Sequence, residues 1–323
     1  MLSIEFLKGQ GLGNQLWNYS SLRAISEKLG YGFRINGANK FKGLEFLDID
    51  FSSPEIVDFK SKTKNIFYET LYYDHIQKTF VSNFDKEILK IKENTEIKGL
   101  FQSEKYFFNK DINKYIKLKN EYKSYKYEIN KVCIMNIRGG EYKRFKNLIL
   151  PKKYWTDAIK NMRKFDKNIE FKIVTDDENY ASKLFPEYEI IKGNIESDFL
   201  EIYFAKFLIV SNSSFSYFPI SLGDKPEVII APAHWARFAN EEEKWISPAN
   251  YYKKWLYQDK EGHILRDKKI KDSIRKTNII YSNYNIKTSI NGLKNNDFKK
   301  YIPESIKKII KIFLSKLFPL NFG

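Results

Sequence analysis

Between Val132 and Pro232 the chain alternates short apolar runs with segments of helical spacing, and this alternation constrains the fold more than any other feature. The runs are rich in β-branched residues, which is typical of strands buried on both faces of a parallel sheet. Strands that alternate with helices predict an α/β domain. The predicted strands are Val132–Ile137, Glu170–Val174, Glu189–Ile191, Phe207–Val210 and Glu227–Ala231. The predicted helices between them are Pro151–Phe165, Glu178–Leu184 and Ser197–Ala205, the last with Ser197 as its N-cap.

Polar residues follow three of these strands. Arg138 follows the first, with Gly139 and Gly140 directly behind it, and its guanidinium is a planar fork of donors that fits phosphate oxygens. Asp176 and Asp177 follow the second strand and offer acceptors for ribose hydroxyls or purine N–H groups. The ends of parallel strands lie at one edge of the sheet, where open α/β folds bind ligands.

Ser213 and Ser214 follow the fourth strand and offer small donors at the start of a helix. Each of these residues taken alone also fits a turn or a helix cap. Placed together at one edge of a sheet, they predict a nucleotide or phosphate site.

The N-terminus repeats the strand, loop and helix order. Leu2–Leu7 is predicted as a strand and Leu16–Leu29 as a helix that Gly30 ends. The glycine-rich loop between them includes Gly11 and Gly13, whose backbone could face a phosphate. The spacing matches neither the dinucleotide fingerprint nor the P-loop. Asn14, at the junction of loop and helix, has two interpretations: it caps the helix, or it points its amide into the site.

The middle of the chain is less regular. Gly32–Asn36 is predicted as a strand, and residues 40–127 are aromatic-rich with mixed periodicity. Ser103 is predicted to cap a helix start. The lysine-rich segment Lys110–Lys131 is either a solvated helix or the connection between two domains.

Composition narrows the class of protein. The chain has 323 residues, 42% of them hydrophobic, which suffices for two domains with real cores. The single Cys133 lies in an apolar strand, which predicts a buried, inert thiol and a reducing compartment. The three histidines are far apart and have no cysteine partners, so no metal site is expected. No apolar run is long enough to span a bilayer, and no signal-peptide pattern opens the chain.

The net charge of +16 is concentrated at the C-terminus. Residues 260–323 hold 15 Lys and Arg against 5 Asp and Glu, or +10, and the other 259 residues hold 41 against 35, or +6. Tyr301–Leu320 is predicted as an amphipathic helix with lysines opposite an apolar face. We expect it to bind an anionic membrane surface, and the alternatives are docking onto the body of the protein or a dimer contact. The uneven charge argues against a nucleic-acid partner.

Several motifs together resemble bacterial α-1,2-fucosyltransferases of glycosyltransferase family 11. In chain order they are GQGLGNQLWNYSSLRA at Gly9–Ala24, LFQSEKYF at Leu100–Phe107, NIRGGEY at Asn136–Tyr142, LPKKYW at Leu150–Trp155, VTDD at Val174–Asp177 and SNSSFSYFPISLG at Ser211–Gly223. The resemblance covers about Met1–Trp255. It implies two Rossmann-like domains facing a cleft (the GT-B type), a GDP-sugar donor, inversion of the anomeric centre and no metal or other cofactor.

The resemblance also implies roles for individual residues. Arg138 matches the family arginine that grips the donor's β-phosphate, and Asn14 matches an asparagine near the donor and the transferred oxygen. Ser213, Ser214 and Phe215 match the block that holds the diphosphate and nucleoside. Asp176 and Asp177 match an acidic pair near the nucleotide.

Glu141 is a candidate general base, and its alternative role is to orient Arg138 through a salt bridge. The family motif has a histidine at the position of Asn136, a second arginine at Gly139 and an aspartate at Glu141. These departures leave both the donor sugar and the activity open.

The expected domains are 1–128 on the acceptor side, 129–258 for the nucleotide sugar, and a basic tail at 259–323. The expected function is transfer of a sugar, L-fucose from GDP-fucose, to a hydroxyl of a bacterial surface glycan or lipid-linked oligosaccharide. This would occur in the cytoplasm, on the inner face of the cell membrane. The alternatives are a degenerate nucleotide-sugar-binding scaffold, or a transferase for another GDP-sugar.

Overall fold

The computed structural model describes residues 1–53, 65–74, 79–123, 131–144, 148–223, 226–235, 238, 242–283 and 287–289. The chain divides into two compact units. Unit 1 holds Met1–Lys117 together with strand β15 (Lys287–Ser289), and unit 2 holds Leu118–Tyr284. The domain boundary predicted at 128/129 falls among residues 124–130, which lie outside the described residues. The short strand β8 (Lys117–Leu118) lies at the observed division.

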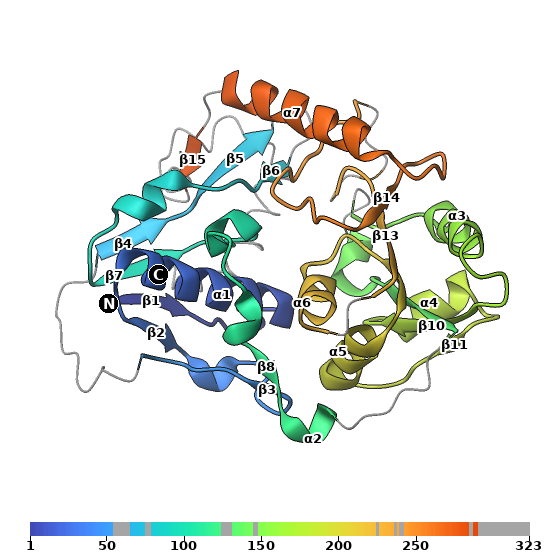
Figure 1. The fold of residues 1–323 in the computed structure, drawn as a ribbon, viewed down its shortest axis with the longest axis horizontal. Helices are drawn as coiled ribbons and strands as arrows, with labels where there is room; N and C mark the ends of the chain where they lie inside the picture. The colour runs from blue at the N-terminus through green and yellow to red at the C-terminus, as the bar shows by residue number, and fades with distance from the viewer. Residues whose placement is uncertain are drawn as a thin grey trace. The chain divides into compact units, whose positions relative to one another are not determined.

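Unit 2 is built on a six-stranded parallel sheet in the order β11-β10-β9-β12-β13-β14. Figure 1 labels β10, β11, β13 and β14 of this sheet. Its strands are β9 (Val132–Ile137), β10 (Glu170–Thr175), β11 (Glu189–Ile190), β12 (Phe207–Val210), β13 (Val228–Pro232) and β14 (Leu256–Gln258). Its helices are α2 (Asn120–Lys123), η5 (Gly140–Arg144), α3 (Lys152–Met162), α4 (Glu178–Leu184), α5 (Ile195–Phe204), α6 (Ser214–Leu222) and α7 (Asp267–Asn283). Numbered along the chain, the strand order is 3-2-1-4-5-6, which is the order of a dinucleotide-binding doubly wound sheet.

The two faces of the central strand β9 have different surroundings. Alternate side chains of a strand point to opposite faces, and Cys133, Met135 and Ile137 join one buried core with α3 and α4. Asn136 therefore points to the other face, and α5 packs against β9 and β10. The thiol of Cys133 is fully buried, as predicted, and burial raises its pKa well above the ordinary value.

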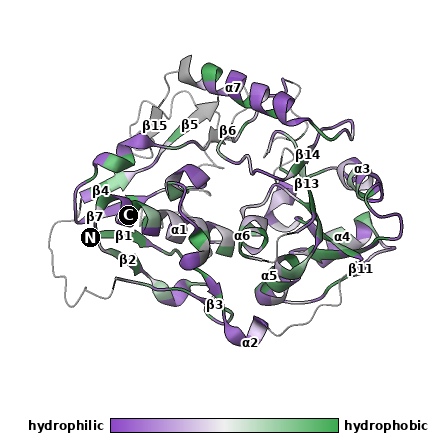
Figure 2. Ribbon diagram, in the orientation of Figure 1, coloured by the Kyte–Doolittle hydropathy of each residue, from purple (hydrophilic) through white to green (hydrophobic). Residues whose placement is uncertain are grey.

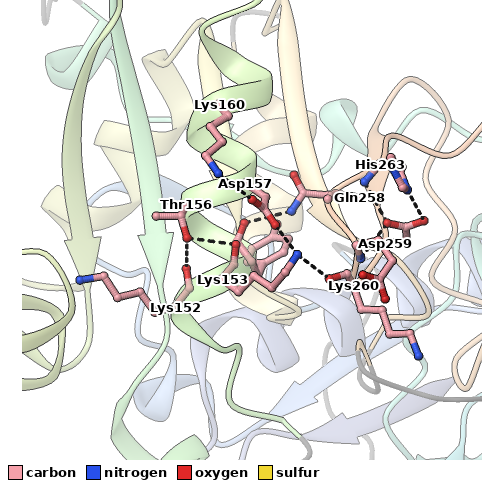
Figure 3. Close-up of polar contacts among 12 residues, drawn as sticks. Lys152, Lys153, Thr156, Asp157, Lys160, Gln258, Asp259, Lys260 and His263 are labelled. Atoms are coloured by element: carbon pink, nitrogen blue, oxygen red, sulfur yellow. Dashed lines mark hydrogen bonds and ion pairs between the residues drawn. The ribbon is translucent and has the colours of Figure 1, made fainter.

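Polar contacts tie α3 to the loop after β14 (Figure 3). Lys153 Nζ donates to Asp157 Oδ2 (2.6 Å) and to the backbone oxygen of Lys260 (3.0 Å). The buried amide of Asn161 donates to Gln258 Oε1 and to the backbone oxygen of Gly262, both at 2.8 Å. These contacts fix the edge of the sheet that β14 forms.

In unit 2, one predicted helix begins earlier than expected, and one observed helix was not predicted. The helix predicted to start at Ser197 begins at Ile195, because Asn194 is its N-cap and Ser197 completes a capping box with it. Helix α7 was not predicted, since its abundant lysines obscure the buried positions Ile270, Thr277 and Tyr281. Hydrophilic and hydrophobic segments alternate along this helix (Figure 2). α7 belongs to unit 2, whereas the sequence predicts a tail from residue 259.

Unit 1 contains a four-stranded parallel sheet in the order β2-β1-β7-β4. The strands of unit 1, inside and outside this sheet, are β1 (Leu2–Glu5), β2 (Phe33–Asn36), β3 (Leu47–Asp48), β4 (Asn65–Tyr68), β5 (Thr70–Asp74), β6 (Thr79–Val81) and β7 (Thr95–Lys98). Strand β15 pairs antiparallel with β5. Its helices are α1 (Leu12–Leu29), η1 (Ala38–Lys40), η2 (Lys86–Lys90), η3 (Glu104–Phe107) and η4 (Ile112–Lys114). The predicted order of strand, loop and helix at the N-terminus is confirmed, and Gly30 ends α1 with a left-handed backbone (φ 70°). The helix begins at Leu12 and not at Leu16, so Asn14 lies inside its first turn and the suggested role of Asn14 as the helix cap is wrong.

A buried carboxylate organises the segment after β7. Glu69 is fully buried and accepts hydrogen bonds from the backbone nitrogens of Leu100 and Phe101 and from the Tyr106 hydroxyl, all at 2.8 Å. Burial raises the pKa of Glu69 to about 7. Ser103 caps η3, as predicted, through its hydroxyl and the backbone nitrogen of Lys105.

The lysine-rich segment that begins at Lys110 was predicted to be either a solvated helix or the connection between two domains. The division between the two units falls inside it, after Lys117, and its described part is not wholly solvated. Four of its apolar side chains are buried: Ile112, Tyr115, Ile116 and Leu118. Glu27 on α1 pairs with Lys110 and accepts a hydrogen bond from the Tyr115 hydroxyl. The segment therefore packs with unit 1, up to the division at Lys117.

The predicted α/β class with two parallel-sheet units is confirmed. The expectation that the units face a cleft stays a prediction. The amphipathic helix predicted at 301–320 lies outside the described residues. In the part of the chain that the structure describes, no helix combines the length and the apolar character needed to cross a membrane.

Candidate functional site

The candidate site lies where the direction of the unit 2 sheet reverses. The chain runs from β9 outward to β10 and β11, and then returns to the other side of β9 as β12. Doubly wound sheets bind ligands beyond the carboxyl ends of the two strands at such a reversal. Here these ends carry Arg138 after β9 and the segment Ser211–Ser214 after β12. β9 and β12 are paired, with Val210 opposite Asn136, so the two segments are neighbours.

The loop after β9 is tied to the end of β10. Asp176 Oδ1 accepts a hydrogen bond from the backbone nitrogen of Gly139 (2.9 Å), and Asp176 Oδ2 lies 3.1 Å from Arg138 Nη1. Asp177 accepts from the backbone nitrogen of Gly140 (3.1 Å), caps α4 at Tyr180 and pairs with Lys143. The hydrogen bond from Lys143 holds the pKa of Asp177 below its ordinary value. The structure therefore uses both carboxylates to shape the loop that carries Arg138, and their contact with a nucleotide stays a prediction.

The two glycines of this loop are required by close packing. A Cβ on Gly139 would lie 2.7 Å from Asp177 Cβ and 2.8 Å from Tyr180 Cδ1. Gly140 has a φ of +30°, and a Cβ there would overlap Asp176 Oδ2. The position at which the family motif has its second arginine is thus closed to any side chain in this protein.

Buried polar atoms without a hydrogen-bond partner gather at the reversal point. Of the nine such atoms among the described residues, four lie here: Asn136 Oδ1, Arg138 Nε, Ser211 Oγ and Asn212 Oδ1. The side chains of Asn136, Ser211 and Asn212 are at most 5% exposed. An unpaired buried polar atom costs about 1–3 kcal/mol, so a cluster of them indicates a site shaped for a polar ligand.

Helix α6 begins directly after these residues. Ser213 is its N-cap and accepts a hydrogen bond from the backbone nitrogen of Phe215 (3.3 Å). No acidic residue occupies its first turn, so the positive end of the helix dipole is not neutralised there. Ser214 is half-buried in the first turn, and the Phe215 ring packs edge-on against Phe199 of α5. The structure thus brings Ser213, Ser214 and Phe215 to the same reversal point as Arg138.

Tyr142 links the two sides of the site. Its hydroxyl donates to the backbone oxygen of Asn212 (3.3 Å), and its ring centroid lies 5.4 Å from the Arg138 guanidinium carbon. Burial raises the pKa of this phenol, so it stays neutral. Asp176 pairs with Arg138 at 3.1 Å and so helps to orient the arginine. Glu141 is exposed in η5, and both roles suggested for it stay predictions.

The remaining predicted residues belong to unit 1. Asn14 Oδ1 accepts a hydrogen bond from Gln102 Nε2 (2.8 Å), so the amide is part of the packing at the start of α1. Gly11 is the N-cap of α1 with an extended backbone, a Cβ added there would meet nothing within 4 Å, and Gly13 is buried in the first turn. The glycine that this loop requires is Gly9, whose φ is +82°. The donor-binding roles of Gly11, Gly13 and Asn14 stay predictions.

Sequence reasoning missed two further groups near the same sheet edge. Asp198 on α5 interacts with Arg138 and Asp176, and burial raises its pKa to about 7. His234 follows β13, is 4% exposed and has a φ of +55°, and burial lowers its pKa to about 4. No local sequence pattern marks Asp198. A histidine shortly after an apolar strand, by contrast, is a recognisable candidate for a site residue, so His234 could have been predicted.

Within the described ranges, no group of three or more His, Cys, Asp and Glu side chains is arranged to hold a metal ion. Metal independence stays a prediction.

No protein-family model matches this chain, and no curated protein matches it. Among solved structures, fucosyltransferase NodZ from Bradyrhizobium is similar at 14% identity, over 69% of this chain and 92% of that one, with a TM-score of 0.40. Heptosyltransferase WaaC from E. coli is similar at 10% identity, over 86% and 100% of the two chains, with a TM-score of 0.43. A family 9 glycosyl transferase from Veillonella parvula is similar at 12% identity, over 99% and 97%, with a TM-score of 0.43. TM-scores below 0.5 establish no shared activity, so the function has to rest on this chain's own residues.

Proposed function

We propose that this protein is a glycosyltransferase that takes its sugar from a nucleoside diphosphate donor. The observation that carries the proposal is the cluster of unpaired buried polar atoms at the β9–β12 reversal, beside Arg138 and the start of α6. A diphosphate fits this chemistry because a guanidinium and helix N-terminal amides both bind phosphate oxygens. Sugar hydroxyls fit the orphaned amide oxygens and the serine hydroxyl, because a hydroxyl both donates and accepts.

The chemical step assigns Arg138 to the leaving group. A bond forms between an acceptor hydroxyl oxygen and the anomeric carbon while the bond from that carbon to the β-phosphate oxygen breaks. The departing nucleoside diphosphate keeps the electron pair, and the hydroxyl proton passes to a carboxylate, for which Glu141 is our candidate. Fixed positive charge beside the leaving group stabilises the transition state, and loss of one such donor typically costs about 100–1,000-fold in rate.

The finer identity rests on the motif resemblance. It supports L-fucose from GDP-fucose as the sugar and donor, inversion without a metal, and Asn14 near the transferred oxygen. The proposed acceptor is a hydroxyl of a bacterial surface glycan or a lipid-linked oligosaccharide. We propose that the basic C-terminal segment holds the enzyme at the inner face of the membrane; equal liposome pelleting with and without residues 300–323 would end that part of the proposal.

A second candidate function is a degenerate protein that binds a nucleotide sugar and does not transfer it. The observation in its favour is the closed position at Gly139, which removes the second phosphate-binding arginine of the related motif. Slow hydrolysis of the donor in the absence of acceptor would argue for the enzyme, because hydrolysis needs the same leaving-group stabilisation.

A thermal-shift panel of GDP, UDP, dTDP and CMP tests the nucleotide site. Ligands that bind only the folded state raise the melting temperature, so preferential stabilisation by one nucleoside diphosphate supports the proposal and names the base. Arg138→Ala should abolish that stabilisation. If no nucleotide shifts the melting temperature, the proposed function is wrong.

A further inference from the structure

Side-chain contacts connect the loop after β9 to the loop after β12 beyond the end of the sheet. The pairing of the two strands continues to the hydrogen bond from the Ser211 backbone nitrogen to the Asn136 backbone oxygen (3.2 Å). Past that bond, the Tyr142 hydroxyl donates to the backbone oxygen of Asn212 (3.3 Å). Asn212 Nδ2 in turn donates to the backbone oxygen of Leu148 (3.3 Å). These contacts join the loop that carries the arginine to the loop that precedes α6.

Asp176 and Tyr142 both restrain the guanidinium of Arg138. Asp176 Oδ2 pairs with Nη1 at 3.1 Å. The ring centroid of Tyr142 lies 5.4 Å from the guanidinium carbon, which is within the range of a cation–π contact. A guanidinium held at one nitrogen can still rotate about that contact, so the ring is the neighbour that restrains the plane of the group.

The orientation of this plane matters for a phosphate ligand. Arginine binds phosphate through parallel hydrogen bonds that lie in the plane of the guanidinium. Arg138 Nε is buried and has no hydrogen-bond partner among the described residues. Asp176 and Tyr142 thus hold the arginine while one of its buried donors remains for a ligand.

We propose that Tyr142 is a positioning residue of the transferase. Its ring holds the Arg138 guanidinium in the orientation that binds the β-phosphate of the donor, and its hydroxyl anchors the ring to the loop before α6. Tyr142 acts on the ligand through the arginine. The inference rests on the proposed function, because it requires a diphosphate at Arg138.

The contribution of Tyr142 should be confined to the β-phosphate. GDP and GMP differ by that phosphate, so the ratio of their affinities isolates what the arginine contributes. Tyr142→Leu removes the ring and should lower the preference for GDP over GMP by about 2- to 30-fold, the range of a cation–π contact. A role in folding alone would weaken the binding of both nucleotides by the same factor.

Two further variants separate the ring from the hydroxyl. Tyr142→Phe keeps the ring and loses the hydrogen bond to Asn212, so it should lose less of the preference than Tyr142→Leu. A ring-fluorinated phenylalanine in place of Tyr142 should lose more than Tyr142→Phe, because fluorine withdraws electron density from the ring face that attracts the cation. Tyr188→Leu removes another half-buried ring of unit 2, which packs against the core that contains Cys133. It is the matched control and should keep the wild-type ratio.

The test is calorimetric titration of the full chain with GDP and with GMP at about pH 8, where the terminal phosphates are ionised. Arg138→Ala should by itself lower the preference for GDP. Adding Tyr142→Leu to Arg138→Ala should not lower the preference further, because the tyrosine acts through the arginine.

The outcomes separate this inference from the proposed function. If the wild type prefers GDP and Tyr142→Leu keeps the full preference, the role of Tyr142 is wrong and the nucleotide site stands. The same holds if Tyr142→Leu weakens GDP and GMP equally, or if its effect on the ratio persists in Arg138→Ala. If the wild type does not bind GDP, both the proposed donor and this inference are overturned. If Tyr142→Leu fails to fold, the phenylalanine and its fluorinated form still decide, since equal ratios in the two would contradict the ring contact.

Discussion

The starts of α1 in unit 1 and α6 in unit 2 differ in how their polar groups are satisfied. Each helix follows a strand at a reversal of a parallel sheet, β1 in one unit and β12 in the other. Around α1, Gln15 bonds to the backbone of Lys40 and Lys42, and Asn14 accepts from Gln102. Around α6, Asn136, Arg138, Ser211 and Asn212 each keep a buried atom without a partner. The difference is confined to the start of each helix, because Ser20 and Ser26 further along α1 also keep buried hydroxyl oxygens without a partner. It makes the reversal in unit 2 the better candidate for binding a polar ligand.

The largest expected effect is the loss of Arg138. Arg138→Ala should lower the rate of sugar transfer by about 100–1,000-fold, because the leaving diphosphate loses its main positive neighbour. Steady-state kinetics with GDP-fucose measures this, and circular dichroism checks that the variant is folded. A folded variant with a nearly wild-type rate of sugar transfer would contradict the placement of the site in unit 2.

The buried acid of unit 1 and the buried histidine of unit 2 should respond to pH in opposite directions. The pKa of Glu69 is about 7 in the folded state against an ordinary 4.5, so its contribution to stability is complete below 4.5 and is lost as pH rises through 7. The pKa of His234 is about 4 against 6.5, so its contribution is present above 6.5 and is lost as pH falls through 4. Each loss amounts to at most about 3 kcal/mol.

Denaturant unfolding across this pH range, for the wild type, Glu69→Gln and His234→Gln, tests these two slopes. Each substitution should remove only the pH dependence of the free energy of unfolding that the replaced residue causes. A Glu69→Gln variant whose stability still falls between pH 4.5 and 7 would show that another group is responsible.

Adding a side chain should change the stability of the protein differently in the two glycine-containing loops. Gly139→Ser should destabilise the protein by about 1–3 kcal/mol, because the new atom overlaps Asp177 and Tyr180. Gly11→Ser should be neutral or slightly stabilising, because the position is open and serine is a good N-cap. Melting temperatures of the two variants provide the measurement, and equal losses would contradict the packing described for Gly139.

The smallest effects have opposite signs in the two units. Asn136→Leu should raise the free energy of unfolding by about 1 kcal/mol, because it removes an unpaired buried oxygen, while weakening donor binding. Gln15→Leu should lower it by about 1–2 kcal/mol, because the backbone groups of Lys40 and Lys42 lose their partner. Chemical denaturation measures both, and a destabilised Asn136→Leu would mean that this amide serves the fold.

The sequence predicts the strands of unit 2 better than it predicts the site. The bounds of β9 and β12 follow directly from their apolar runs, and the polar residues after them identify the edge that matters. The amphipathic pattern of α7 was missed because charged residues dominate it. The loop after Arg138 donates hydrogen bonds to Asp176 and Asp177 because β9 and β10 are neighbouring strands. Local sequence patterns do not specify which strands are neighbours. The electrostatic interaction of Asp198 with Arg138 depends on how α5 packs against β9 and β10, which no local sequence pattern specifies.

A crystal structure of the protein with bound GDP-fucose tests the central claim most directly. The account predicts diphosphate oxygens within hydrogen-bond distance of Arg138 and the first backbone amides of α6, with the orphaned atoms of Asn136, Ser211 and Asn212 paired to the ligand. A diphosphate bound elsewhere, with those atoms still unpaired, would contradict it.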